Sequence, residues 1–198
     1  MADRRVTGRA GRLLLLRRLS SAQRAVDLLD RKLRILRAEQ ARIRREADED
    51  IRAWQAATSA LDRAVTRAAI LGGRRGLRLA APPGAATVTL SWLEIMGTRF
   101  PSSATIDVVR PDPCGPVTAA AAAAAGESLR AAVRVACSAA ARRTVETEIS
   151  RTRRRLHALT ERWIPTCEQA LQEIAQRLDE EDRDEMVRRR WAAGRPVR

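Results

Sequence analysis

The residues that could do chemistry are few and lie far apart along the chain. His157 is the only histidine, so this chain alone cannot assemble a Ser-His-Asp triad or a histidine-rich metal site. The cysteines stand at positions 114, 137 and 167, a spacing that fits no zinc or CxxC pattern, and we expect unpaired thiols in a reducing compartment. We expect His157 to lie on a helix surface or in a helix seam. The sequence predicts neither catalysis nor a cofactor.

Two further stretches resemble binding motifs only superficially. Gly72-Gly73-Arg-Arg-Gly76 lacks the GxxxxGK[ST] pattern of a phosphate loop and is more typical of a helix stop. The acidic run Asp179–Glu185 is continuous, whereas a calcium loop alternates its oxygen ligands and includes a glycine. We expect this run to be a solvated helix face.

Arginine dominates the charge of the chain. The formal net charge is +14, and Lys32 is the only lysine. This excess predicts an anionic partner or a place inside a larger complex. Arginines cluster at 4–5, 17–18, 44–45, 153–155 and 188–190, but no interleaved aromatics or helix-turn-helix pattern indicates nucleic-acid binding. We interpret the clusters as solvated helix faces or docking surfaces for acidic proteins, and we expect Trp54 and Trp163 to pack in a seam.

A long helix is predicted from residue 7 to residue 72. Apolar residues recur every three or four positions from Leu15 to Leu71, and no proline interrupts them. This is the 3.5-residue period of a coiled coil, sustained for about eight heptads. At 1.5 Å per residue, about 60 residues would form a rod of roughly 90 Å. Gln40 and Asp50 interrupt the apolar seam and could help to set the register between two helices.

Residues 73–118 have a different character and form a predicted central insert. Pro82-Pro83-Gly84 excludes helix, and β-branched residues alternate over 87–96 and again over 104–109. We expect a hairpin or two short strands, joined through 97–103. Because a lone hairpin is only marginally stable, this one should pack on the coil or on another protein.

A second long helix is predicted over residues 119–191, and it opens with seven consecutive alanines. Its apolar positions are Leu129, Val133, Ala136, Ala140, Val145, Ile149, Leu156, Leu159, Trp163, Cys167, Leu171, Ile174 and Leu178. The steps from Leu159 to Leu171 are all fours, a stutter that locally unwinds a supercoil. Pro165 falls within it and would remove a helical hydrogen bond and bend the rod.

The predicted fold is therefore all-α, a long antiparallel two-helix coiled coil with a small central insert that contains a short β-hairpin. A symmetric hairpin of helices would place Leu29 near Leu171 and Ile43 near Leu156. No apolar stretch is long enough to span a bilayer, so we expect a soluble chain or one that is peripheral to a membrane through its partners.

Four stretches, in this order, resemble the D subunit of V-type and archaeal-type (V/A) ATPases. They are GRLLLLRRL at 11–19, VDLLDRKLRIL at 26–36, IMGTRFP at 95–101, and RLHAL at 155–159 followed by Ile164-Pro165 and LDEEDRDE at 178–185. His157 departs from the asparagine common in the family, and Thr160 from its glutamate. The residues matched to family motifs are Leu28, Leu29, Lys32, Leu36, Met96, Gly97, Pro101, Ala158, Leu159, Pro165, Leu178, Glu180, Arg183 and Glu185.

The resemblance implies a non-catalytic rotor shaft in the central stalk. Its paired terminal helices would enter the catalytic A/B hexamer, its insert would lie where the shaft meets the F subunit, and its lower end would dock on the adaptor above the membrane ring. It would act at the inner face of the plasma membrane.

Two alternatives remain open at this point. The γ subunit of F-type ATPases shares two long terminal helices, but its middle region is longer than this insert of about 45 residues. A basic coiled-coil protein that binds nucleic acid or serves as a scaffold would show steeply salt-dependent affinity for DNA.

Overall fold

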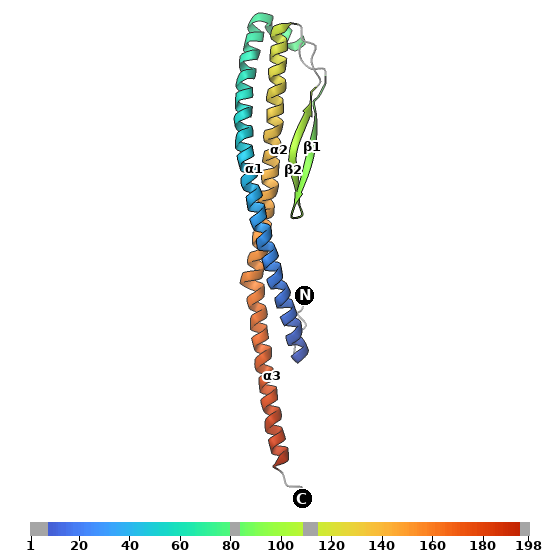
Figure 1. Cartoon of the computed structure of the whole chain (residues 1–198), viewed down its shortest axis with the longest axis vertical. Helices are drawn as coiled ribbons and strands as arrows, with labels where there is room; N and C mark the ends of the chain where they lie inside the picture. The colour runs from blue at the N-terminus through green and yellow to red at the C-terminus, as the bar shows by residue number, and fades with distance from the viewer. Residues whose placement is uncertain (1–7, 80–83, 109–114, 195–198) are drawn as a thin grey trace. The chain divides into compact units, whose positions relative to one another are not determined.

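The computed structural model describes residues 8–79, 84–108 and 115–194 and confirms the predicted fold class (Figure 1). In chain order the elements are α1 (Gly8–Leu79), β1 (Thr87–Ile95), β2 (Thr98–Asp107), α2 (Pro116–Ala158), a five-residue π-helix (Leu159–Trp163) and α3 (Ile164–Ala193). The chain divides into two compact units. Unit 1 combines Met1–Leu33 with Arg151–Arg198, and unit 2 is Arg34–Ser150. None of the described helices is long and apolar enough to cross a membrane.

Helix α1 follows the predicted seam closely. Seven of the predicted seam residues are buried: Leu15, Ala22, Leu33, Leu36, Ile43, Ala47 and Ala68. Two others depart from the prediction, because Trp54 is 39% exposed and Leu71 is 68% exposed. Gly73 has the non-helical angles φ 65° and ψ 175°, one residue after the predicted helix end, and helical structure resumes as far as Leu79. A positive φ favours glycine, which explains why the interruption falls there.

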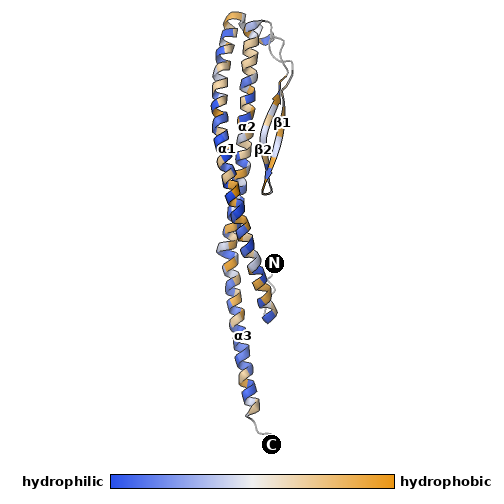
Figure 2. Cartoon of the chain, in the orientation of Figure 1, coloured by the Kyte–Doolittle hydropathy of each residue, from blue (hydrophilic) through white to orange (hydrophobic). Residues whose placement is uncertain are grey.

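Helix α2 buries Val145 and Ile149, as predicted, but much of its seam differs from the predicted apolar pattern. Leu129 and Ala136, both expected in the seam, are exposed. The buried positions up to residue 152 are Thr118, Ala121, Ser128, Ala131, Cys137, Ala141, Val145, Ile149 and Thr152. Figure 2 shows the weak contrast between apolar and polar residues along this helix. Small residues let two helices approach closely, and a buried hydroxyl can bond within its own helix or across the seam.

Within unit 2, polar pairs across the seam fix how α1 and α2 are aligned. Gln40 Nε2 donates to Glu146 Oε1 at 3.3 Å, and Arg134 Nε lies 3.4 Å from Asp50 Oδ1. The hydroxyls of Thr58 and Ser128 are 3.2 Å apart. Gln40 and Asp50, the two predicted interruptions of the seam, therefore both meet polar groups of the facing helix.

This alignment corrects the symmetric register. Ile43 was predicted to lie near Leu156. It instead lines a cavity with Cys137 and Ala141, which precede Leu156 on α2 by about two heptads. In unit 1, Leu171 packs on the buried cluster of Leu15, Cys167 and Ile174 rather than at Leu29. A slip of whole heptads leaves every seam residue facing the partner helix, so the apolar period could not have selected the register.

The predicted stutter appears in unit 1 as a π-helical turn. The backbone N–H of Ile164 donates to the carbonyl of Leu159, five residues earlier, immediately before Pro165. Proline has no N–H, and its ring would collide with the carbonyl four residues before it in a regular α-helix. A wider turn relieves that collision and inserts one extra residue into the helix. The chain thus accommodates Pro165 without ending the helix.

The insert is one antiparallel hairpin in which Thr87 pairs with Asp107 and Ile95 with Thr98. Its turn is Met96-Gly97, with φ values of 52° and 72° at the two residues. Two positive φ values in a two-residue loop are those of a type I′ turn, which matches the twist of the strands. The predicted loop at 97–103 was wrong, since β2 already begins at Thr98. A bulge at Ser102, beside Pro101, lets the strand tolerate the proline.

Phe100 attaches this hairpin to the helices. It is the only phenylalanine in the chain, it is fully buried, and it lines a cavity with Ile43 and Ala141. Thr98 and Pro101 are also buried, whereas no residue of β1 is. The hairpin therefore packs through β2 on the two helices of unit 2. This packing supplies the support that a lone, marginally stable hairpin needs.

The register can be tested by cross-linking. In a background with the natural cysteines replaced by alanine, Thr58→Cys combined with Ser128→Cys should oxidise to an intramolecular disulfide, because the two hydroxyls are in contact. Thr58→Cys combined with Arg142→Cys tests the symmetric register, two heptads away, and should remain reduced. Non-reducing electrophoresis and peptide mass spectrometry distinguish the two outcomes. A disulfide only in the second variant would contradict the structure.

Candidate interaction surfaces

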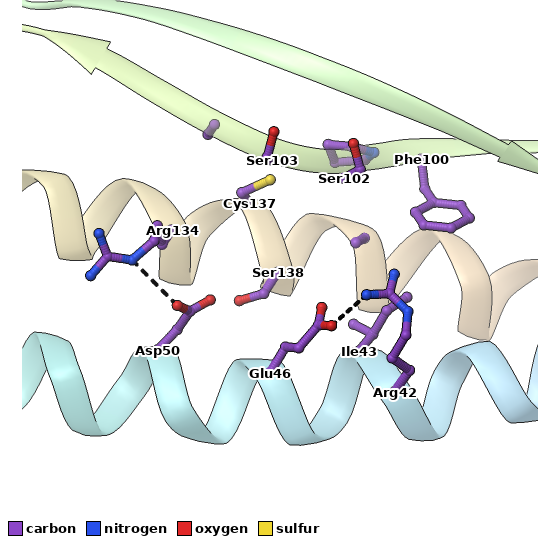
Figure 3. A pocket seen from close by; sticks show the side chains of 13 residues that line it. Arg42, Ile43, Glu46, Asp50, Phe100, Ser102, Ser103, Arg134, Cys137 and Ser138 are labelled. Carbon is purple, nitrogen blue, oxygen red and sulfur yellow. Dashed lines mark hydrogen bonds and ion pairs between the residues drawn. The ribbon is translucent and has the colours of Figure 1, made fainter.

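The cavity between β2 and the two helices of unit 2 brings several charged side chains together (Figure 3). It has a volume of about 130 Å³ and is lined by residues of α1, α2 and β2. Arg42 pairs with Glu39 and Glu46 on its own helix, and these carboxylates raise the pKa of its guanidinium further. Arg134 pairs with Asp50. The charged groups in this cavity are therefore matched within the chain.

Cys137 is the nucleophilic side chain of this cavity, and its surroundings keep it unreactive. The thiol is buried and is not part of a disulfide. Burial raises its pKa, and the negative charge of Asp50 raises it further. Because the thiolate is the reactive form, a raised pKa lowers reactivity at neutral pH. Cys167 is also buried, while Cys114 lies outside the described residues.

The remaining candidates for chemistry lie on helix surfaces. His157 is exposed, and so is every residue of the acidic run from Asp179 to Glu185. No three His, Cys, Asp or Glu residues within the described ranges are arranged to hold a metal ion. Among the described residues, the cavity and these surfaces do not bring a nucleophile, a base and an orienting group together.

Unit 1 carries an open groove with a basic rim, here called the basic groove. It has a volume of about 540 Å³ and is lined by Arg17, Arg18, Ser21, Ala22, Leu159 and Trp163. Trp163 is 37% exposed, so it borders this groove rather than filling a seam as predicted. The π-helical turn contains both Leu159 and Trp163, so the wide turn shapes one wall of the groove.

Charge in unit 1 is separated along the sequence. Residues 9–24 hold five arginines and no acidic residue, and 151–163 hold five arginines and Glu161 alone. Residues 168–185 hold eight acidic residues and two arginines. Exposed apolar side chains lie within the basic stretch, at Leu13, Leu14 and Leu16. Mixed basic and apolar surface of this kind is typical of a docking site for an acidic protein.

The end of α1 before Gly73 presents a second apolar surface. Ile70 is 76% exposed and Leu71 is 68% exposed, and both line an open groove with Asp62, Arg63, Thr66 and Arg67. Leu71, which was predicted to lie in the seam, is therefore exposed together with Ile70.

The motif residues from the sequence fall into two groups. Leu36 and Pro101 are buried, and Leu29, Lys32, Leu159 and Leu178 are half-buried, so these support packing. Leu28, Met96, Gly97, Ala158, Pro165, Glu180, Arg183 and Glu185 are exposed and available to partners. Glu185 forms an ion pair with Arg189 one turn later. Of the exposed group, Met96 and Gly97 belong to unit 2, and the other six residues belong to unit 1.

Sequence reasoning missed Phe100 as the anchor of the hairpin and Ser128 and Thr152 as seam residues. Phe100 carried a usable signal, since it is the only phenylalanine in a chain that is poor in aromatics. The two hydroxyl residues gave none, because small polar side chains are equally common on exposed helix faces.

The protection of Cys137 can be measured directly. At pH 8 in the folded chain, iodoacetamide should modify Cys137 at least about tenfold more slowly than in the urea-unfolded chain, because burial and Asp50 disfavour the thiolate. Modification should accelerate as the pH rises beyond the usual thiol range. Asp50→Asn should accelerate it at fixed pH. Equal rates in folded and unfolded chains, followed on the Cys137 peptide by mass spectrometry, would contradict this assignment.

Comparison with known proteins places this geometry in a family. A family model for the D subunit of ATP synthase matches residues 12–194, which include both long helices and the hairpin. The comparison with curated proteins found no match. The long helices, the small antiparallel hairpin and this match agree with one another. The chain belongs to the ATP synthase D-subunit family, the stalk subunits of V/A-type ATPases.

Proposed function

We propose that this chain is the rotor shaft of a V/A-type ATPase. It would couple ATP hydrolysis or synthesis in a catalytic A/B hexamer to ion movement through a membrane ring by rotating. The chain would catalyse nothing itself and would act at the inner face of the plasma membrane, held there by its partners. The family match over residues 12–194 carries the proposal, because it includes both long helices and the hairpin.

The seam offers physical support for a role in transmitting torque. A shaft of two helices fails if the helices slide past each other. Sliding would separate Gln40 from Glu146 and Asp50 from Arg134 and leave these half-buried groups without partners. Because Arg134 is 47% exposed and Glu146 39% exposed, each such pair contributes up to about 1 kcal/mol. Several such pairs along one seam therefore oppose sliding more strongly than apolar packing alone.

The exposed surfaces can be assigned to the partners of such a shaft. We assign the basic groove and the exposed leucines at 13, 14 and 16 to the catalytic hexamer. The hairpin is assigned to the F subunit, and the apolar end of α1 at Ile70 and Leu71 to the membrane-ring adaptor. Each surface is apolar with charged residues at its margin, as expected of protein–protein contacts.

Affinity purification tests the proposal. The tagged chain, expressed in its own cell, should co-purify with the A and B subunits at physiological salt, and the complex should hydrolyse ATP. The rival interpretation, a basic nucleic-acid-binding protein, predicts retention of nucleic acid that falls steeply with added salt, by about 10³-fold or more between 50 and 200 mM for a many-phosphate contact. Recovery of nucleic acid without A or B subunits would refute the rotor assignment.

Pro165 provides a prediction about coupling. The π-helical turn is absent from the facing part of α1, so it makes the two helices of unit 1 unequal, and unequal faces are what three catalytic sites need to be driven differently. Pro165→Ala should allow a regular α-helix and rotate the residues before it relative to those after it. We expect normal assembly but less ion movement per ATP hydrolysed.

Ion pumping and ATP hydrolysis in reconstituted complexes, together with single-molecule rotation, measure this effect. Thr166→Ala is a matched control, since Thr166 is exposed and follows the proline directly. Unchanged coupling and torque in the Pro165 variant would remove the turn from the mechanism.

A further inference from the structure

Asp50 and Arg134 form an ion pair across the seam of unit 2. Arg134 Nε lies 3.4 Å from Asp50 Oδ1, and the Asp50 side chain is only 23% exposed. Arg42 and Glu46 also line the cavity beside this pair, but both stand on α1 and pair with each other. Their contact is kept wherever α2 lies along α1, whereas the contact of Asp50 with Arg134 depends on the position of α2.

The residues that a slide of α2 would bring opposite Asp50 can be read from the sequence. A slide by whole heptads keeps the seam residues of a coiled coil facing each other, and one heptad is about 10 Å of helix. At seven-residue steps from Arg134, α2 carries Ala120, Glu127, Ala141 and Glu148. Two of these positions are acidic and none is basic, so Arg134 is the position in this set that attracts Asp50.

Two of the slipped alignments set one carboxylate against another. A slide of one heptad in one direction places Glu127 opposite Asp50. A slide of two heptads in the other direction, which is the symmetric alignment suggested by the apolar period, places Glu148 there. Repulsion between like charges is screened less where a group is partly buried, as Asp50 is. The two remaining alignments offer Asp50 an alanine and leave it without its partner.

The other polar contacts of this seam discriminate less between alignments. Gln40 Nε2 donates to Glu146 Oε1, and the hydroxyls of Thr58 and Ser128 are in contact. At seven-residue steps before Glu146 stand Ala139, Ala132 and Ala125, and at the steps beside Ser128 stand Ala121 and Val135. A slide therefore removes these hydrogen bonds but sets no like charges together. Attraction in one alignment and repulsion in its competitors add in the free-energy difference that determines specificity.

We infer that Asp50 and Arg134 are the positioning pair that determines the register of α1 on α2, and that Glu127 and Glu148 exclude two of its slipped alternatives. The charges of these four residues select one alignment among several that the apolar seam accepts. The inference rests on contacts within unit 2 and not on the proposed function.

A charge exchange between two residues of α2 tests this inference in the full chain. Glu127→Arg combined with Arg134→Glu keeps the net charge and moves the cation by one heptad. Arg130 pairs with Glu127 at 2.7 Å, and in the variant it finds a carboxylate one turn later instead. The observed alignment then opposes two carboxylates at Asp50, and the alignment one heptad away pairs Asp50 with an arginine.

Disulfide formation reports the register in the background that lacks the natural cysteines. Thr58→Cys with Ser128→Cys reports the observed alignment, and Thr58→Cys with Ala121→Cys reports the alignment one heptad away. We expect the exchange to raise the initial rate of the second disulfide relative to the first at least about tenfold. An unchanged ratio of the two rates would overturn the inference.

A reversal of the facing charge separates electrostatics from packing. Asp50→Arg added to the exchange inverts all three charges, so attraction returns to the observed alignment and repulsion to the slipped one. The ratio of rates should fall back to within about twofold of its starting value. Glu46, one turn before Asp50, favours neither alignment because it moves with α1. Failure of this third substitution to restore the ratio would show that the charges do not determine the register.

A matched control and a separate functional measurement complete the test. Arg130→Glu changes the charge of α2 as much as Arg134→Glu does, but the ion-pair partner of Arg130 lies on its own helix, so the ratio should not change. In reconstituted complexes, the exchange should lower ion movement per ATP hydrolysed, and Asp50→Arg should restore it. A changed ratio with unchanged coupling would count against the proposed rotor function and leave the register inference intact.

Discussion

The alignment of two long helices depends on a few polar contacts inside an otherwise apolar seam. Burial of leucine, isoleucine and alanine drives the helices together, but it is nearly indifferent to a slip of one or two heptads. Gln40 with Glu146, Asp50 with Arg134, and Thr58 with Ser128 are not indifferent, because each loses its partner on slipping. Stability and register therefore come from different residues.

This division explains which features could be predicted from the sequence. The period of α1 could be recognised because large apolar residues alternate with arginine and glutamate, and most of its predicted seam is buried. The seam of α2 was recognised at Val145 and Ile149 but missed at other buried positions, because alanine occurs on all faces of the helix and serine and threonine occupy buried positions. The register between α1 and α2 was missed because the partners of Gln40 and Asp50 on α2 could not be recognised. Gln40 and Asp50 themselves were recognisable as residues that could set the register.

Local backbone conformation could be predicted at glycine and proline, because each of these residues favours particular backbone conformations. The glycine pair marked the interruption of α1 to within a residue, and Pro165 marked the irregular turn of the last helix. The start of β2 was missed because Pro101 suggested a loop, whereas a bulge beside the proline kept the strand intact. The interaction surfaces could be anticipated only as arginine clusters, since a groove such as that of Arg17, Arg18 and Trp163 depends on which helix faces meet.

The exposed apolar surfaces of this chain reflect its scarcity of large side chains. With only 3% aromatic residues, the chain has few groups that bury much area at once, and it places most of them at the margins. Phe100 is committed to holding the hairpin, while Trp92 and Trp191 are at least half exposed and Trp54 and Trp163 more than a third. Large aromatic side chains on the surface are the residues that contribute most when a partner covers them. A chain that leaves all four of its tryptophans more than a third exposed is suited to being covered by partners in an assembly.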